Sequence, residues 1–181
     1  MVYGSKIADI YMIYGISNCF YAVWGKGGYS TPSPLKYAVE ADIKSNKVSQ
    51  TAKICGIERA IGHFGDGYAI NLKLYELPSH FLQAVLHYTK ENGILKEISN
   101  VNSVHFALMF ETKENKRFEY PDCCCLPPNF DVSTVTDTIT MNPFSLSIAA
   151  VPRPTDMCVQ AFTTNETPEE VYSNWFNAVQ V

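Results

Sequence analysis

Charge is one thing that this chain of 181 residues has little of. Its 14 Lys and Arg against 18 Asp and Glu give a formal net charge of −4, and charged residues make up only 18% of the sequence. Nowhere do Lys and Arg gather into a cluster. A protein that holds nucleic acid by neutralising phosphates normally carries such clusters. Tight nucleic-acid binding is therefore disfavoured.

Long apolar runs are also missing. Residues 1–9 contain no basic region followed by an apolar core, so no secretion signal is expected. The longest uncharged run, residues 10–25, includes Gly, Ser, Asn and Tyr and falls short of the roughly 18 apolar residues of a membrane span. We therefore expect no membrane partner and synthesis in a reducing cytosol, where cysteines stay free thiols. The six cysteines are Cys19, Cys55, Cys123, Cys124, Cys125 and Cys158.

The spacings that mark catalytic and metal sites do not occur either. The triplet "CCC" has no second cysteine pair to complete a zinc site, and no His-x-x-x-His pair exists. There is no Gly-x-Ser-x-Gly elbow, and "GKGGYSTP" lacks the Gly-Lys-Ser/Thr ending of a phosphate loop. We predict no catalytic residue, no metal ligand and no cofactor, and hence not an enzyme. A metal protein built on the cysteines is the least favoured alternative.

Alternation of apolar and polar residues is what the sequence does have. This period of two places successive side chains on opposite faces of a strand. It predicts strands at residues 35–43, 68–75, 135–141 and 144–151, a hairpin over 104–120 that turns at 113–116, and a weaker strand at 14–24. The expected inward residues of the first strand and of the hairpin's first arm are Leu35, Tyr37, Val39, Ala41, Ile43, Val104, Phe106, Leu108 and Phe110.

The cysteine triplet lies on the return arm of that hairpin, which Pro127 and Pro128 end. Cys123 and Cys125 then share one face of the strand, and Cys124 points the other way. Small buried apolar residues are the preferred interpretation of all three.

Two helices are predicted. Residues 78–93 have Ser79 as a possible N-cap and Gly93 as a stop signal. In the tail, Thr167 and Glu170 form a capping box, with Pro168 at the first helical position. The tail's apolar stripe must be buried on its own domain or on a neighbouring subunit. Residues 45–67 have no sustained period, which indicates a long loop or an irregular hairpin, and such a segment usually has a function.

The order of these elements resembles the major tail tube protein of long-tailed, non-contractile bacteriophages. The resemblance covers about residues 35–152 and is carried mainly by "DGYAINLKLYELP", "FALMFETKENK" and "TDTITM". It implies a mainly β fold, a β-sandwich or open barrel of tail-tube type with one flanking helix, a long loop and a C-terminal helix. It also implies rings of six subunits whose stacking forms the conduit for DNA ejection, in a virion tail made in the host cytoplasm. The implied partners are further copies of the chain and the tape measure, tail terminator and distal tail proteins.

The resemblance further assigns regions within a single domain of residues 1–181: an N-terminal segment 1–34, an inter-ring loop 44–67 and a C-terminal extension 155–181. A tube that conducts a polyanion must not grip it, so polar strand faces are the lumen candidates: Glu40, Asp42, Asn71, Thr136, Thr138, Thr140, Ser145 and Ser147. The inter-ring candidates are Lys47, Lys53, Ile54, Ile57, Arg59 and Phe64. The subunit-interface candidates are Val171, Tyr172, Trp175 and Phe176.

Two other functions stay open. A tube protein of a related injection machine would share the same pattern. A β-sandwich binding module, of the carbohydrate-binding or adhesin-like kind, would instead have an exposed aromatic platform and be a stable monomer.

Overall fold

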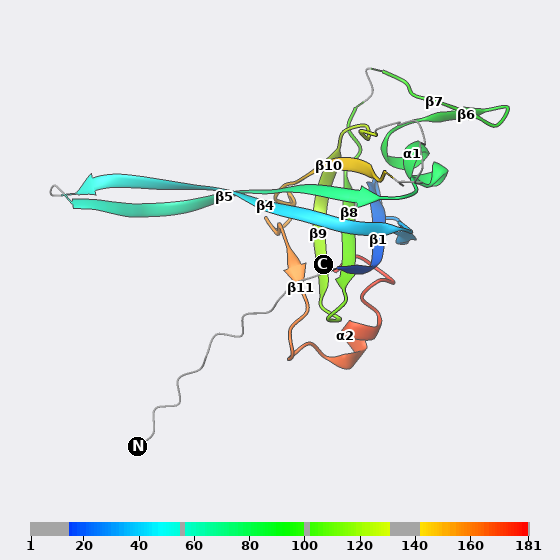
Figure 1. Ribbon diagram of the computed structural model, residues 1–181. Coiled ribbons are helices and arrows are strands. Elements are labelled where there is room, and N and C mark those ends of the chain that lie inside the picture. The colour runs from blue at the N-terminus through cyan, green and yellow to red at the C-terminus, as the bar shows by residue number, and fades with distance from the viewer. Residues whose placement is uncertain (1–14, 55–56, 100–101, 131–141, 181) are drawn as a thin grey trace, which may run out of the picture.

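One large antiparallel sheet dominates the computed structural model, which describes residues 15–54, 57–99, 102–130 and 142–180 and gives the backbone alone for 47–66 (Figure 1). The strand order is β2-β1-β8-β9-β10-β5-β4, with β3 beside β1 and β11 beside β9. The strands are β1 (Ile16–Gly25), β2 (Gly28–Tyr29), β3 (Ser33–Pro34), β4 (Ala38–Ile54), β5 (Ile57–Leu74), β8 (Phe106–Thr112), β9 (Arg117–Cys125), β10 (Phe144–Ala150) and β11 (Ala161–Phe162). The mainly β class expected from alternation is confirmed.

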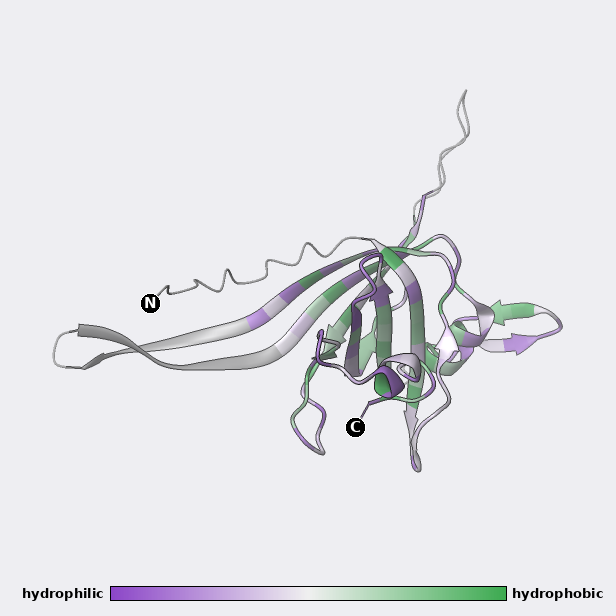
Figure 2. Cartoon of the chain, turned by 90° about the horizontal axis from the view of Figure 1, so that it is seen from below, coloured by the Kyte–Doolittle hydropathy of each residue, from purple (hydrophilic) through white to green (hydrophobic). Residues whose placement is uncertain are grey.

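The core lies between the sheet and helix α1 (Ser79–Val85). Leu72, Leu108 and Leu146, from three strands, are fully buried. Phe81 of α1 meets the ring of Tyr21 edge-on at 4.9 Å between centroids, which seats the helix on the sheet. In the described residues β4 pairs on one side only, with β5, so the sheet is an open structure and not a closed barrel. Figure 2 shows hydrophobic and hydrophilic residues alternating along strands of the body.

The paired strands β8 and β9 confirm the hairpin that the sequence predicts at residues 104–120. Its strands pair in antiparallel register from Glu111 opposite Arg117 to Phe106 opposite Cys123. Every residue of β8 is buried, so both faces of this strand are covered. In β10, Leu146, Ile148 and Ala150 are buried while Ser147 and Ala149 are exposed, as alternation predicts. The strand expected at residues 135–141 lies outside the described residues.

The start of β4 departs from the expected alternation. A register shift between Ala38 and Glu40 marks a β-bulge, and one extra residue in a strand reverses the side chains that precede it. Ala38 therefore packs against the core and Val39 is 40% exposed. Tyr37, which is 60% exposed, lies in the turn before β4 and has φ of 63°. The expectation that Tyr37 and Val39 face inward is wrong.

Helix α1 is shorter than the sequence indicates. It ends at Val85, and a separate hairpin of β6 (Thr89–Glu91) and β7 (Ile94–Lys96) follows. Asn92 and Gly93 form its two-residue turn with φ of 51° and 81°, which is the conformation that Asn-Gly favours between antiparallel strands. Gly93 thus closes a hairpin and does not stop the helix. Pro78, without a side-chain cap, precedes the helix, so the expected Ser79 cap is also wrong.

In the described part of the tail, only the five residues of α2 (Glu169–Ser173) are α-helical. Pro168 takes the N-cap position, and no side-chain capping bond forms. Thr167 instead accepts a hydrogen bond at Oγ1 from the N–H of Thr164, which fixes the turn before the helix. No helix in the described part of the chain is long and apolar enough to cross a membrane.

Residues 45–54 and 57–67 are the two paired strands of a hairpin, the second of the two alternatives that the sequence left open. Strands β4 and β5 stay paired as far as Ile54 opposite Ile57, with register shifts near Ser45 and Gln50. Figure 1 shows β4 and β5 extending well beyond the body of the sheet. We refer to residues 47–54 and 57–65 as the arm.

Candidate functional site

The lumen candidates that the structure describes lie together on one face of β4, β5 and β10. Glu40 pairs with Lys73, and Lys73 with Ser145; Asp42 pairs with Asn71, and Asn71 with Ser147. Cross-strand partners share a face, and the buried Leu72, Leu146 and Ile148 alternate with them on the other face. Thr136, Thr138 and Thr140 lie outside the described residues. Which surface lines a lumen stays a prediction.

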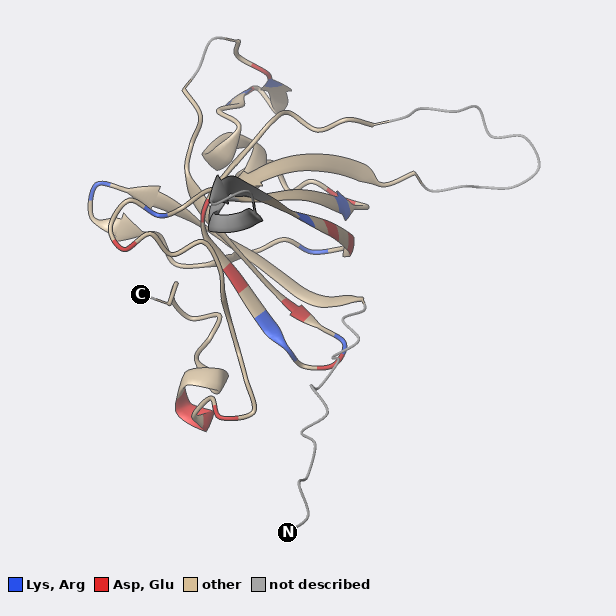
Figure 3. Ribbon diagram, turned by 90° about the vertical axis from the view of Figure 1, so that its left-hand side faces the viewer, with Lys and Arg blue, Asp and Glu red and all other residues tan. Residues whose placement is uncertain are grey.

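Charges on this polar face are paired with one another. Lys73 Nζ lies 2.9 Å from Glu40 Oε2, and Lys44 Nζ lies 2.8 Å from Asp42 Oδ2. The hydrogen bond from Lys44 to Asp42 raises the pKa of the lysine. These two lysines are not among the lumen candidates predicted from the sequence. Lys73 lies two residues from Asn71 and Lys44 two residues from Asp42, so alternation places them on the same face. The result is a polar face without excess charge, and Figure 3 shows acidic and basic residues interspersed on the body.

A shallow groove of about 490 Å³ opens on the same face, and Cys124 lines it together with Asn71, Ser103, Leu126 and Ser147. Cys123 points the other way and is fully buried in the core, and Cys125 packs against that core, as alternation predicts. Burial raises the pKa of the Cys124 thiol and raises that of Cys125 to about 12. These thiols are therefore protonated at neutral pH and poor nucleophiles. No group of three or more His, Cys, Asp or Glu in the described residues is placed to hold a metal ion.

The arm leaves the body at a glycine. Gly67 has φ of +114°, and a Cβ atom at this position would overlap the carbonyl oxygen of Ala150 on β10. Only glycine allows both this backbone conformation and so close an approach. All six inter-ring candidates lie on the arm: Lys47, Lys53, Ile54, Ile57, Arg59 and Phe64. Their contact with another ring stays a prediction.

The C-terminal segment, residues 169–180, lies over the second face of β1, β8 and β9, and we call it the strap. Phe176 stacks on Phe20 of β1 with ring centroids 4.7 Å apart. Val179 is buried against Ala22 and Ala107 in a small apolar cluster that also contains Met109. The strap thus explains why both faces of β8 are buried.

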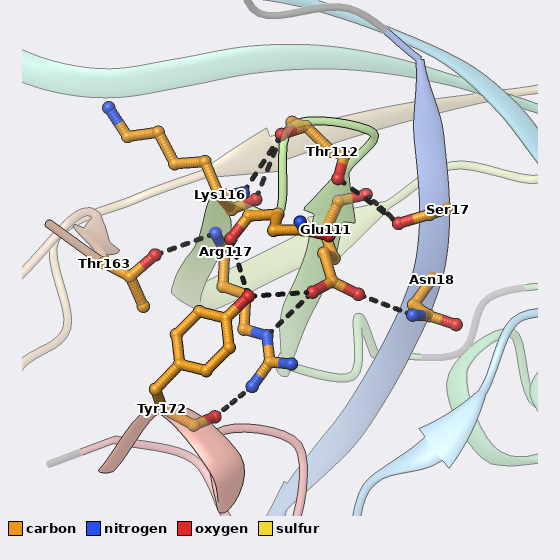
Figure 4. A network of polar contacts seen from close by, with 9 residues as sticks. Ser17, Asn18, Glu111, Thr112, Lys116, Arg117, Thr163 and Tyr172 are labelled. Atoms are coloured by element: carbon orange, nitrogen blue, oxygen red, sulfur yellow. Dashed lines mark hydrogen bonds and ion pairs between the residues drawn. The ribbon is translucent and has the colours of Figure 1, made fainter. Parts of the chain in front are cut away.

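A polar network fixes the first turn of the strap (Figure 4). Arg117 Nε donates to Glu111 Oε1 at 3.1 Å, and the same guanidinium donates to the carbonyl of Tyr172. Glu111 also accepts from Asn18 Nδ2 at 2.6 Å. Burial of Glu111 disfavours its charge, but the hydrogen bonds from Asn18 and Arg117 outweigh this and hold its pKa below the ordinary value. Strands β1, β8 and β9 are joined to the strap through one carboxylate and one guanidinium.

The subunit-interface candidates therefore mostly contact their own chain. Tyr172 binds the network, Phe176 packs on the sheet and Trp175 is only 5% exposed. Val171 is 40% exposed and is the one candidate with a large free surface. Of the two alternatives for the aromatic stripe, the structure has burial on its own domain, and contact with a second subunit stays a prediction.

The sequence matches no protein-family model and no curated protein sequence. Among solved structures, the chain is similar to one in the anti-feeding prophage cap, the tube terminating cap, at 11% identity over 89% of this chain and 99% of that chain, with a TM-score of 0.42. A chain of the anti-feeding prophage baseplate has 4% identity, 89% and 100% coverage and a TM-score of 0.43. A chain in the PVC sheath-tube complex of an extracellular contractile injection system is 11% identical over 91% of this chain and 99% of that chain, with a TM-score of 0.37. Likeness at this level assigns neither a family nor a function.

Proposed function

We propose that the chain is a structural, non-enzymatic subunit of a phage-type tail tube. Copies join side by side into rings of six, and the rings stack into a conduit for double-stranded DNA. The arm is the observation that carries this proposal. It is a paired β-ribbon that reaches past the body, and no other described element pairs with it. A two-stranded ribbon alone is marginally stable in water, so a ribbon of this length needs a partner surface, which a neighbouring ring supplies.

The open edge of the sheet supports assembly within a ring. In the body, β4 pairs with β5 on one side, and no described strand pairs with its other side. Unpaired edge groups invite another strand. The bulge at Val39 and the ion pair of Lys44 with Asp42 sit on this edge and limit which strand fits. A ring removes the edge by repeating one contact between copies.

The polar face of β4, β5 and β10 suits the lining of such a conduit. Its lysines are neutralised by Glu40 and Asp42, so few free cations are left to release counterions from DNA. The neutral side chains of Asn71, Ser145 and Ser147 complete a surface along which DNA slides. The tape measure, terminator and distal tail proteins are the expected partners at the tube's interior and ends, and a related injection machine is the nearest alternative setting.

Negative-stain electron microscopy of the concentrated protein, together with its mass in solution, tests the proposal. Rings or hollow tubes are expected. The matched control replaces residues 51–61 with Asn-Gly, which joins the cross-strand partners Gln50 and Gly62 by a two-residue turn near the body. We expect this variant to melt like the wild type, because the arm lies outside the core, and to form rings that do not stack. A monodisperse wild-type monomer at all concentrations, with and without tail initiator proteins, would refute the proposal.

One observation favours a binding module as the second candidate. Tyr37 and Tyr75 are 60% and 42% exposed, and the Tyr75 N–H donates to the Tyr37 carbonyl, which brings the two positions together. Tyrosine is enriched at binding interfaces because it combines a large apolar ring with a polar hydroxyl group. Binding of an oligosaccharide by a monomer, lost in a Tyr37→Ala variant of normal stability, would favour this candidate.

A further inference from the structure

A second polar anchor holds the far end of the strap, and its central residue is Glu119 of β9. The Glu119 side chain is completely buried. Both of its carboxylate oxygens accept from the backbone N–H of Gln180, at 3.1 and 2.9 Å. The strap therefore closes directly over this carboxyl group.

No ion pair neutralises Glu119 within the described residues. The charge of Arg153 acts on Glu119. Arg153 itself donates from Nε and Nη2 to Asp156 at 2.9 and 2.6 Å and from Nη1 to the carbonyl of Gln180 at 3.4 Å. Its charge is thus balanced by Asp156. The other ionisable groups around this anchor are Tyr29, whose hydroxyl donates to the Pro121 carbonyl, and Asp122, which is hydrogen-bonded to His105.

No ion pair therefore offsets the free-energy cost of burying a negative charge on Glu119. Burial raises the pKa of Glu119 to about 7, while the N–H of Gln180 and the charge of Arg153 oppose this only in part. A carboxylate sealed from water without a paired cation is strongly disfavoured, and the neutral acid is disfavoured much less. When the strap lifts, water reaches Glu119 and its pKa returns toward the ordinary 4.5.

We propose that the strap is a pH-responsive cover whose closure over β1, β8 and β9 is coupled to proton binding at Glu119. Glu119 binds its proton more tightly when the strap is closed, so closure becomes weaker as the pH rises. Closure is strongest below about pH 4.5, weakens as the pH rises toward 7, and changes little above that. Opening uncovers the apolar surface of Phe20, Ala22, Ala107 and Met109. This coupling belongs to the isolated subunit and does not depend on the tube function.

Amide hydrogen exchange tests the coupling at the bond that makes the anchor. The measurement is the protection factor of the Gln180 N–H between pH 4.5 and 7.5, which removes the intrinsic pH dependence of exchange. In the wild type it is expected to fall by up to about a hundred-fold across this range. In Glu119→Gln, which cannot ionise, it should stay flat. Glu166→Gln, at an exposed position, is the matched control and should behave like the wild type. An equal fall in Glu119→Gln and wild type, or no fall in the wild type, would overturn the proposal.

A second measurement does not depend on whether Glu119→Gln folds. The ¹³C resonance of the Glu119 carboxyl group in the wild type should titrate with a midpoint of about 7. Val179→Asp places a charge against Ala22 and Ala107 and forces the strap open, so there the midpoint should fall toward 4.5. A wild-type midpoint near 4.5, or a midpoint that Val179→Asp leaves unchanged, would overturn the coupling.

Discussion

The guanidinium carbon of Arg117 lies 3.8 Å from the ring centroid of Tyr172, while the same guanidinium donates to the Tyr172 carbonyl. One cation therefore holds the strap through both the ring and the backbone of a single residue. Its remaining hydrogen bond goes to Glu111 on β8. Because Arg117 and Glu111 pair across β8 and β9, the anchor is part of the sheet itself, and the strap is fixed to the most buried hairpin of the fold.

Replacing Arg117 with Met should cost about 3 kcal/mol of unfolding free energy, because it leaves the nearly buried Glu111 carboxylate without its cation. Tyr172→Phe removes only the hydroxyl contacts to Glu111 and the Asn115 carbonyl and should cost about 1 kcal/mol. Urea denaturation measures both, and the double variant measures their coupling. Lys26→Met, at an exposed turn position, is the control. A loss in Arg117→Met no greater than in this control would contradict the anchoring role.

The glycine at the root of the arm gives a second prediction. Gly67→Ala should destabilise the protein by more than about 2 kcal/mol, since the new methyl group meets the Ala150 carbonyl and the backbone conformation is strained. Gly27→Ala is the matched control, because nothing lies within 4 Å of a Cβ there. Thermal denaturation followed by circular dichroism compares them. Equal melting temperatures for the two variants would show that the arm is not fixed at this point.

Alternation located those strands that have one face against the core. It identified β5, β8, β9 and β10 because residues such as Leu72, Leu108 and Leu146 must face inward at every second position. It fails at Val39, where a bulge shifts the phase and leaves no mark in the pattern of apolar residues, and at Tyr37, which lies in the turn before the strand. The Asn92-Gly93 turn does carry a readable signal, but a glycine after a helical pattern also predicts the end of that helix.

The arm and the strap were less accessible to sequence reasoning for a physical reason. A ribbon that projects from the body has no core of its own chain to impose a period, so residues 45–67 appeared irregular. The aromatic stripe of the tail correctly indicated burial, but a helical period was inferred where only Glu169–Ser173 is helical. The partners of the strap, Arg117 and Glu119, appeared as ordinary strand charges because only the folded sheet places them beneath it.

Cysteine reactivity should follow burial along the triplet. Cys124 is half-buried and opens on the groove, whereas Cys123 is fully buried and has a pKa well above its ordinary value. We expect iodoacetamide at pH 8 to modify Cys124 slowly in the folded protein, and Cys123 only after unfolding. Peptide mass spectrometry assigns the sites. Equal rates at Cys123 and Cys124 would contradict the packing.

The same thiols also test whether two subunits can be crosslinked by oxidation. If Cys124 lies on a face that meets another copy, air oxidation should produce covalent multimers on non-reducing gels, and Cys124→Ser should abolish them. Multimers that persist in Cys124→Ser would place the contact elsewhere, and their absence from the wild type would exclude this crosslink.

The balance of charge on the polar face gives the last prediction. Changing Glu40 and Asp42 to Lys removes both neutralising carboxylates and leaves Lys73 and Lys44 unpaired beside the new cations. Duplex DNA should then bind the assembled protein with an affinity that falls steeply with salt, because each added phosphate contact releases counterions. Fluorescence anisotropy of a labelled duplex in 50 to 200 mM salt measures this. Glu166→Lys with Glu169→Lys makes the same charge change at exposed positions before and in α2. If both double variants bind DNA equally, net charge alone explains the effect, and the polar face is not the surface that meets DNA. If only the variant with Lys at positions 40 and 42 binds, the ion pairs of Glu40 and Asp42 in the wild type are what let DNA pass.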